Sequence, residues 1–275
     1  MNLKLAEELK ITTKVSSFIE AYDFEVYDIV KTNVLFTQLR PILFVIMGLY
    51  LAGIYFGQRW MKNRPPYNLS YALFLWNLAL AVFSILATIR GFPEVAYLVS
   101  QNDGLYSATC DRGVHNFATS FWALMFVLSK IVELGDTAFI VLRKQKLIVL
   151  HWFHHLATLF LCWLGYEYYE TAARFFVVNT FVHSFMYSYY ALKAVKVQIP
   201  KRVSRALTSI QILQMIFFLF VVTSYVRNTS AGKPCPINSE LVTFGGIIIL
   251  IFTVLFVNFF VQTYSGKRGA KSKAS

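Results

Sequence analysis

Long apolar runs separated by short polar segments fill the chain from about residue 37 onward. A membrane-spanning helix needs about 17–25 mostly apolar residues. The pattern therefore predicts an all-α membrane protein with seven transmembrane helices, at 37–57, 71–90, 118–142, 147–166, 172–192, 206–226 and 240–264. We expect one membrane domain over 1–275, with a polar N-terminal tail at 1–36 and a basic tail at 265–275.

The composition excludes soluble classes of protein. Apolar residues make up 57% of the chain and charged residues 15%, against about 45–50% and about 25% in an average soluble protein. The formal net charge is +12, but nucleic-acid binders place their basic residues on a polar surface. Here the basic residues stand between apolar runs, so we expect no nucleic-acid partner.

Lysine and arginine gather on one side of the predicted membrane. The side of the membrane that holds the C-terminus carries none of the 14 acidic residues. The basic clusters on this side are 59–64, 143–146, 193–205 and 267–273. Short cytosolic loops are enriched in Lys and Arg, so we expect a cytosolic C-terminus and an N-terminus on the opposite, luminal side. This rule alone would explain the pattern. The absence of acids also leaves a positive mouth suited to a polyanion such as a nucleotide or a CoA ester.

Short local signals indicate the compartment. Lys271 and Lys273, three and five residues from the end, resemble the dilysine retrieval signal of endoplasmic reticulum membrane proteins. Cys110 and Cys235 fall in two predicted luminal loops, where an oxidising lumen would allow a disulfide. Asn228 begins a sequon on the same side, close to a membrane end, and is the glycosylation candidate. These signals favour the endoplasmic reticulum.

Polar side chains recur inside four of the predicted spans, where they are expensive and are functional candidates. On each span they lie three or four residues apart, so they share a helix face. At 1.5 Å rise per residue, most of them lie about 6–15 Å from the cytosolic end. We therefore expect one polar chamber open to the cytosol above an apolar tunnel. The residues are Lys130, Glu133 and Asp136; His151, His154 and His155; Asn179, His183 and Tyr187; and Gln211 and Gln214.

Structural roles are open to some of these residues. Lys130 and Glu133 could be an ion pair that only fixes packing. Glutamines 211 and 214 could simply hydrogen-bond neighbouring helices. Three His within five residues of one membrane helix have no comparable structural explanation.

The histidine cluster HWFHH (151–155) is compatible with a metal or with direct chemistry. The chain has five His in total, and His115 falls in a luminal loop, which leaves too few for a His-rich di-iron centre. A single metal with three His ligands stays open. Neutral imidazole is also a nucleophile and a general base near neutral pH, and it could accept an acyl group from a thioester.

Several motifs together resemble the very-long-chain fatty acid elongases, the condensing enzymes (3-ketoacyl-CoA synthases) of the endoplasmic reticulum. The resemblance runs in order from about Phe74 to Tyr264. Its motifs are KIVELGDT (130–137), HWFHH (151–155), HSFMYSYY (183–190) and TSIQILQ (208–214). The tract LWNLALAVFSI, with Gly135 and Trp152, is similar to the branch acting on saturated and monounsaturated acyl-CoAs of palmitate length.

The resemblance implies that long-chain acyl-CoA and malonyl-CoA give 3-ketoacyl-CoA, CoA and carbon dioxide. It implies that His154 takes the acyl group and that His183 assists as a base or orients the oxyanion. His151, His155, Asn179, Lys130, Glu133 and Asp136 would support them, while Tyr187, Gln211 and Gln214 would line the chamber. The basic mouth, with Lys144, Lys201, Lys267 and Arg268, would receive the CoA phosphates. No metal or redox cofactor is implied, and the expected partners are the 3-ketoacyl-CoA reductase, dehydratase and enoyl reductase of the cycle.

Other classes remain as alternatives. A seven-span receptor would need a ligand cleft on the luminal side, away from the observed polar residues. A His-dependent transporter usually shows a second access path or an internal repeat, and the sequence has neither. A single-metal lipid-modifying enzyme is the third alternative. The sequence leaves acyl-chain preference and association into a homodimer open.

Overall fold

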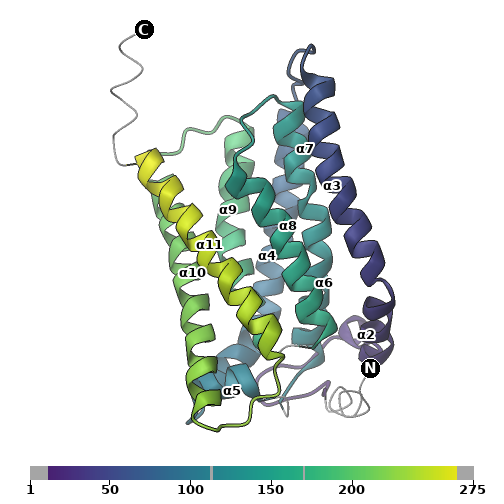
Figure 1. Ribbon diagram of the computed structural model, residues 1–275, viewed down its shortest axis with the longest axis vertical. Coiled ribbons are helices and arrows are strands. Elements are labelled where there is room, and N and C mark those ends of the chain that lie inside the picture. The colour runs from purple at the N-terminus through teal and green to yellow at the C-terminus, as the bar shows by residue number, and fades with distance from the viewer. Residues whose placement is uncertain (1–11, 112–113, 170, 265–275) are drawn as a thin grey trace.

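The computed structural model describes residues 12–111, 114–169 and 171–264. Within these ranges the regular structure is helical, apart from two isolated β-bridges that join Thr13 to Asn116 and Val15 to Glu20. The long helices run roughly side by side, and the short helices α2 (Ile29–Gln38) and α5 (Gly104–Cys110) lie at one end of the bundle with the N-terminal segment (Figure 1). The predicted all-α class is confirmed.

Four helices of the described chain are long and apolar enough to cross a membrane, namely α3, α4, α10 and α11. The other predicted spans correspond to α6 with α7, to α8, and to η2 with α9. These segments are shorter or more polar. The bounds are η1 (Asp23–Glu25), α2 (Ile29–Gln38), α3 (Arg40–Met61), α4 (Ser70–Val99), α5 (Gly104–Cys110), α6 (Phe117–Glu133), α7 (Gly135–Leu142), α8 (Val149–Glu167), η2 (Thr171–Phe175), α9 (Phe176–Ala194), α10 (Lys201–Ser230) and α11 (Ser239–Tyr264).

Two predicted spans differ from the helices that form. The span predicted at 118–142 is broken at Leu134 into α6 and α7, where α4 packs closely: a Cβ on Gly135 would lie 2.7 Å from the Trp76 ring. The span predicted at 71–90 continues as helix to Val99. The charged residues in this extension have buried partners, because Arg90 pairs with Glu25 and Glu94 pairs with Arg174.

Helices α4 and α9 form a tight interface in the middle of the bundle. Gly91 allows this approach, since a Cβ there would meet the side chains of Phe176 and Val177 at 2.6 Å. Phe176 and Val177 join Trp122 and Phe126 of α6 in a buried apolar cluster. Helix α3 lies at the edge of the bundle (Figure 1), and only Leu43, Tyr50 and Met61 of its side chains are buried.

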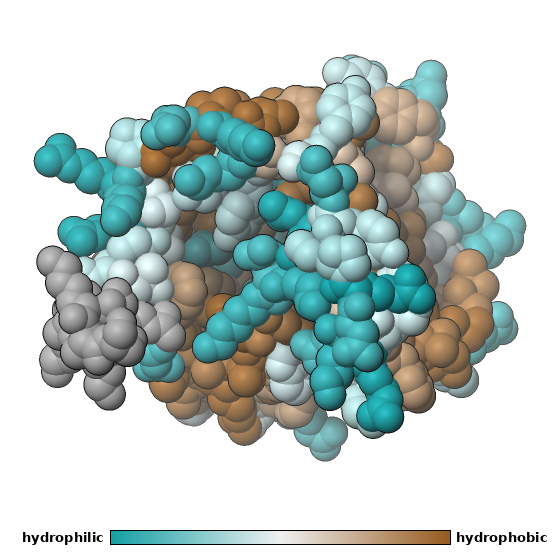
Figure 2. Space-filling model, turned by 90° about the horizontal axis from the view of Figure 1, so that it is seen from above, coloured by the Kyte–Doolittle hydropathy of each residue, from teal (hydrophilic) through white to brown (hydrophobic). Residues whose placement is uncertain are grey.

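The two ends of the bundle differ in character. At the end with the N-terminal segment and α5, Glu25 accepts hydrogen bonds from Arg90 and Trp122, and Glu94 contacts His115 and Arg174. The opposite end carries the loops at 62–69, 143–148 and 195–200 and the end of α11 (Figure 1). Hydrophilic side chains gather on this face (Figure 2). The basic clusters at 59–64, 143–146 and 193–205 therefore share one end.

Candidate functional site

Two cavities meet inside the bundle. The first has a volume of about 430 Å³ and lies towards the basic end, with polar side chains from α4, α7, α8, α9 and α10 in its wall. The second has a volume of about 280 Å³, is lined mainly by apolar side chains of α6, α8, α9, α10 and α11, and reaches Thr109 and Ile237 near the other end. Four residues line both cavities, namely His154, Asn179, Gln214 and Met215. We call them the polar cavity and the apolar cavity.

The histidine cluster lies on α8, where residues three and four apart share a face. His151, His154 and His155 all line the polar cavity. The His154 ring packs 4.8 Å from the Phe252 ring, and its Nδ1 is buried without a hydrogen-bond partner among the described residues. No described side chain or backbone group therefore fixes the tautomer of this ring through Nδ1.

His151 and His155 have defined neighbours. His151 Nε2 lies 3.1 Å from Thr137 Oγ1, and its ring centroid lies 4.5 Å from that of His155. His155 Nε2 lies 3.8 Å from Asp136 Oδ2. These contacts fix the rings on either side of His154 along the helix.

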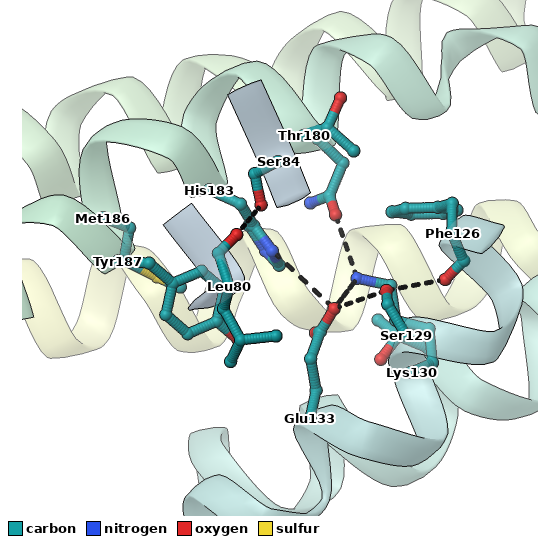
Figure 3. A network of polar contacts seen from close by, with 12 residues as sticks. Leu80, Ser84, Phe126, Ser129, Lys130, Glu133, Thr180, His183, Met186 and Tyr187 are labelled. Carbon is teal, nitrogen blue, oxygen red and sulfur yellow. Dashed lines mark hydrogen bonds and ion pairs between the residues drawn. The ribbon is translucent and has the colours of Figure 1, made fainter. Parts of the chain in front are cut away.

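A buried charge pair stands behind the histidines. Lys130 Nζ donates to both carboxylate oxygens of Glu133, at 2.8 and 3.0 Å, and lies 3.3 Å from Asn179 Oδ1. His183 Nδ1 lies 4.0 Å from Glu133 Oε1 on the other side of the carboxylate (Figure 3). Asn179 Nδ2 reaches Gln214 Oε1 at 3.5 Å. The ammonium is thus neutralised and linked through Asn179 to the junction of the two cavities.

The break between α6 and α7 turns the next carboxylate in another direction. Asp136 Oδ1 accepts a hydrogen bond from Trp76 Nε1 at 2.6 Å, and Oδ2 accepts one from Tyr187 OH at 2.9 Å. Asp136 and Tyr187 line the polar cavity, whereas Glu133 lies outside both cavity walls. The two carboxylates therefore have separate partners.

Most of the predicted site residues come together at the two cavities. Gln211 also lines the polar cavity, where its Nε2 lies 3.4 Å from Met186 Sδ, and Lys130 lines the apolar one. The other predicted residues that line one or both cavities are His151, His154, His155, Asn179, His183, Asp136, Tyr187 and Gln214.

The predicted phosphate-binding residues fit less well. Lys144 Nζ donates to the backbone carbonyls of Lys62 and Arg64, at 3.1 and 3.0 Å, and is absent from the polar cavity wall, as is Lys201 at the start of α10. Arg143 and Lys193 line that wall instead. The reason is local, because Lys144 takes a left-handed backbone conformation (φ 53°) as the chain leaves α7. Lys267, Arg268, Lys271 and Lys273 lie outside the described residues.

Sequence reasoning missed two residues of α4 that contribute to the site. Trp76 positions Asp136, and Asn77 lines the polar cavity. Tyr190 and Thr208, which belong to the motifs at 183–190 and 208–214, complete the wall of this cavity. Trp76 and Asn77 stand in an apolar run that reads as an ordinary span. Two signals were available, the lone amide of Asn77 in that run and the resemblance of the tract LWNLALAVFSI, which contains both residues.

The remaining predictions concern the other end of the bundle. Cys110 and Cys235 form a disulfide that joins the end of α5 to the segment between α10 and α11. Asn228 lies in the last turn of α10, where its amide donates to the Ser224 carbonyl at 2.8 Å. His115 is buried beside Glu94, far along the chain from the cavity histidines. Within the described ranges, no group of three His, Cys, Asp or Glu side chains is arranged to hold a metal ion.

Comparison with known proteins gives one consistent family. The model of the GNS1/SUR4 family matches residues 35–272. The chain is 39% identical to very long chain fatty acid elongase 6 of Drosophila melanogaster, covering 84% of this chain and 74% of that one. It is 36% identical to human very long chain fatty acid elongase 3, covering 97% and 98%, and 39% identical to human elongase 6, covering 84% and 87%. The chain therefore belongs to the GNS1/SUR4 family of very long chain fatty acid elongases.

Proposed function

We propose that this enzyme of fatty acid elongation catalyses the condensation of long-chain acyl-CoA with malonyl-CoA through an acyl group carried on His154. The observation that carries the proposal is the position of His154, which lines both cavities and has an unpaired ring nitrogen. An acyl chain in the apolar cavity and a thioester in the polar cavity would bring the thioester carbon to this ring.

The proposed reaction has two steps. A nitrogen of the neutral His154 ring attacks the thioester carbon, the carbon–sulfur bond breaks, and CoA leaves as the thiol with the proton that the ring gives up. Malonyl-CoA then loses carbon dioxide, and the carbon that keeps the electron pair attacks the acyl carbon. The carbon–nitrogen bond breaks, the ring takes up a proton, and 3-ketoacyl-CoA leaves.

Neighbouring groups support these steps in our proposal. His183, held 4.0 Å from Glu133, serves as base or orients the oxyanion that forms on the acyl carbon. The Lys130–Glu133 pair and Asn179 fix the wall at the junction. His151, His155 and Asp136 hold the histidine face, and Tyr187, Gln211 and Gln214 line the space for the thioester. The account requires neither a metal nor a redox cofactor.

We infer that CoA enters from the basic end of the bundle. Arg143 and Lys193 in the polar cavity wall are the described cations best placed for its phosphates. Lys201, Lys267 and Arg268 stay in the proposal as further phosphate contacts. The proposal includes seven spans, formed by α3, α4, α6 with α7, α8, α9, α10 and α11. It places the chain in the endoplasmic reticulum with its C-terminus in the cytosol, where the reductases and dehydratase of the cycle act on its product.

The test is two-carbon extension by purified protein in lipid, with labelled malonyl-CoA and acyl-CoAs of about twelve to twenty carbons. We expect labelled 3-ketoacyl-CoA from the wild type and at least about a thousandfold less from His154→Ala, because a nucleophile is lost. His115→Ala is the matched histidine control for loss of activity, because His115 lines neither the polar nor the apolar cavity. Absence of product from folded wild-type protein would contradict the proposal, and full activity in His154→Ala would contradict the role of His154.

A further inference from the structure

Helix α3 contributes one polar side chain to the interior of the bundle. This side chain is Tyr50, which is 9% exposed, whereas its neighbours Leu49 and Leu51 are 66% and 42% exposed. The Tyr50 hydroxyl lies 2.8 Å from Thr137 Oγ1 on α7. Thr137 is 2% exposed, so this hydrogen bond forms away from solvent.

The same threonine oxygen contacts the histidine cluster. Thr137 Oγ1 lies 3.1 Å from His151 Nε2. Tyr50, Thr137 and His151 therefore form a chain of two hydrogen bonds that runs from the edge helix to the wall of the polar cavity. Because neutral imidazole is a donor at one nitrogen and an acceptor at the other, the direction of this chain decides which nitrogen of His151 carries the proton.

The hydroxyl protons allow one consistent direction. A buried phenol needs an acceptor for its proton, and among the described residues Thr137 Oγ1 is the acceptor that the Tyr50 hydroxyl has. If Tyr50 donates to Thr137, the threonine proton is free to point to His151 Nε2. The reverse direction would leave the phenol proton without an acceptor among the described residues, and a buried donor without an acceptor is unfavourable.

We propose that Tyr50 is a positioning residue that sets the tautomer of His151, through Thr137, with the proton on Nδ1. The expected change in condensation activity rests on the proposed function, whereas the tautomer of His151 does not. Without the phenol, Thr137 Oγ1 is free to accept a hydrogen bond from His151 Nε2–H as well as to donate one to this nitrogen. The ring then divides between two tautomers next to His155 and His154.

The test compares Tyr50→Phe with Tyr55→Phe, a variant of a tyrosine on the same helix that is 60% exposed. Tyr50→Phe keeps the ring and removes only the hydroxyl. We expect kcat to fall by about tenfold, with KM for both CoA substrates within about twofold, and we expect Tyr55→Phe to match the wild type. Thr137→Val should also lower kcat, because it removes the hydroxyl that both hydrogen bonds share, whereas Thr137→Ser should keep the activity of the wild type. The double variant Tyr50→Phe/Thr137→Val should lose little more than Thr137→Val alone.

A spectroscopic readout separates a tautomer effect from loosened packing. In protein labelled with ¹⁵N at histidine, the His151 signals are assigned by their loss in His151→Gln. We expect Nε2 of the wild type to show the shift of an unprotonated ring nitrogen and to move towards the protonated value in Tyr50→Phe. Unchanged His151 shifts, or Tyr50→Phe activity equal to wild type, would overturn the inference. Inactive wild-type protein would instead count against the proposed function, and the spectra would still test the tautomer.

Discussion

At the scale of single residues, Lys130 and Glu133 are charged groups with almost no access to water, each 3% exposed. A buried ion pair adds little net stability, but removal of one partner leaves the other charge uncompensated, which costs about 3–5 kcal/mol. Glu133 compensates the charge of Lys130, and its carboxylate accepts a third hydrogen bond from Ser129 Oγ at 2.9 Å. The pair therefore has to be kept or removed as a unit.

We expect Glu133→Gln to lower the melting temperature strongly and to lower activity, because the Lys130 ammonium would lose its counter-charge. Ser129→Ala is the matched control, since it removes one neutral donor from the same carboxylate and should cost only about 1 kcal/mol. Thermal unfolding in detergent and the extension assay measure both. Equal losses of melting temperature and activity in the two variants would show that neither quantity depends on the charge of Glu133.

At the scale of elements, the break between α6 and α7 gives Asp136 a different set of partners from Glu133. The break at Leu134 is followed by Gly135, which has no room for a side chain, because an added Cβ would lie 2.7 Å from the ring of Trp76. Trp76 Nε1 in turn holds Asp136. The position of one α4 side chain thus controls a carboxylate in the polar cavity.

Gly135→Ala should therefore displace Trp76 and reduce condensation by about tenfold or more, while the helical content stays the same. Gly53→Ala on α3 is the control, because nothing lies within 4 Å of a Cβ there. Activity and circular dichroism of the two variants decide the matter. Wild-type activity in Gly135→Ala would mean that Asp136 does not need the Trp76 hydrogen bond.

The apolar pattern of the sequence predicted which helices form, but not every residue at which a helix ends. Apolar runs of membrane length placed the helices within a few residues, and the shared helix faces brought the histidines and amides together. The extension of α4 beyond Arg90 depends on Glu25 and Arg174, which are distant in sequence. Arg143 and Lys193 line the cavity wall, where the sequence predicted Lys144, and this difference depends on how the chain turns after α7. Neither follows from a local pattern.

At the scale of the whole molecule, the N-terminal segment is attached to the bundle by a buried carboxylate outside the membrane spans. Burial by itself would raise the pKa of Glu25. Hydrogen bonds from Arg90, the Tyr22 backbone N–H and Trp122, together with the Arg90 charge, instead hold this pKa below its usual value of 4.5. A lowered folded-state pKa contributes stability above the unfolded value, and that stability is lost as the pH falls through the folded value.

We therefore expect the melting temperature to fall when the pH drops below about 4.5, and we expect Glu25→Gln to reduce this dependence. At neutral pH the variant should be less stable than the wild type, since Arg90 loses its partner. Thermal unfolding of both proteins from pH 7 to pH 3 checks the prediction, with Glu20→Gln, a substitution of an exposed glutamate in the same segment, as control. Parallel curves for Glu25→Gln and wild type would contradict it.

The length of the apolar cavity leads to a prediction about substrates. Gly165 lines this cavity on α8, eleven residues from His154 or about 16 Å along the helix, and a Cβ there meets nothing within 4 Å. Gly165→Leu should therefore remove the longest acyl-CoAs from the substrate range and spare the shorter ones. Gly53→Leu is the control, and the extension assay over the acyl-CoA panel gives the result. An unchanged range would mean that the acyl chain lies elsewhere.

The central claim is that His154 carries the acyl group, and intact-mass measurement tests it most directly. Wild-type protein is mixed with a long-chain acyl-CoA in the absence of malonyl-CoA. The account predicts release of one CoA per site, a mass increase of one acyl group that maps to the His154 peptide, and loss of that mass when malonyl-CoA is added. Product formation without any such adduct, or an adduct that persists in His154→Ala, would contradict it.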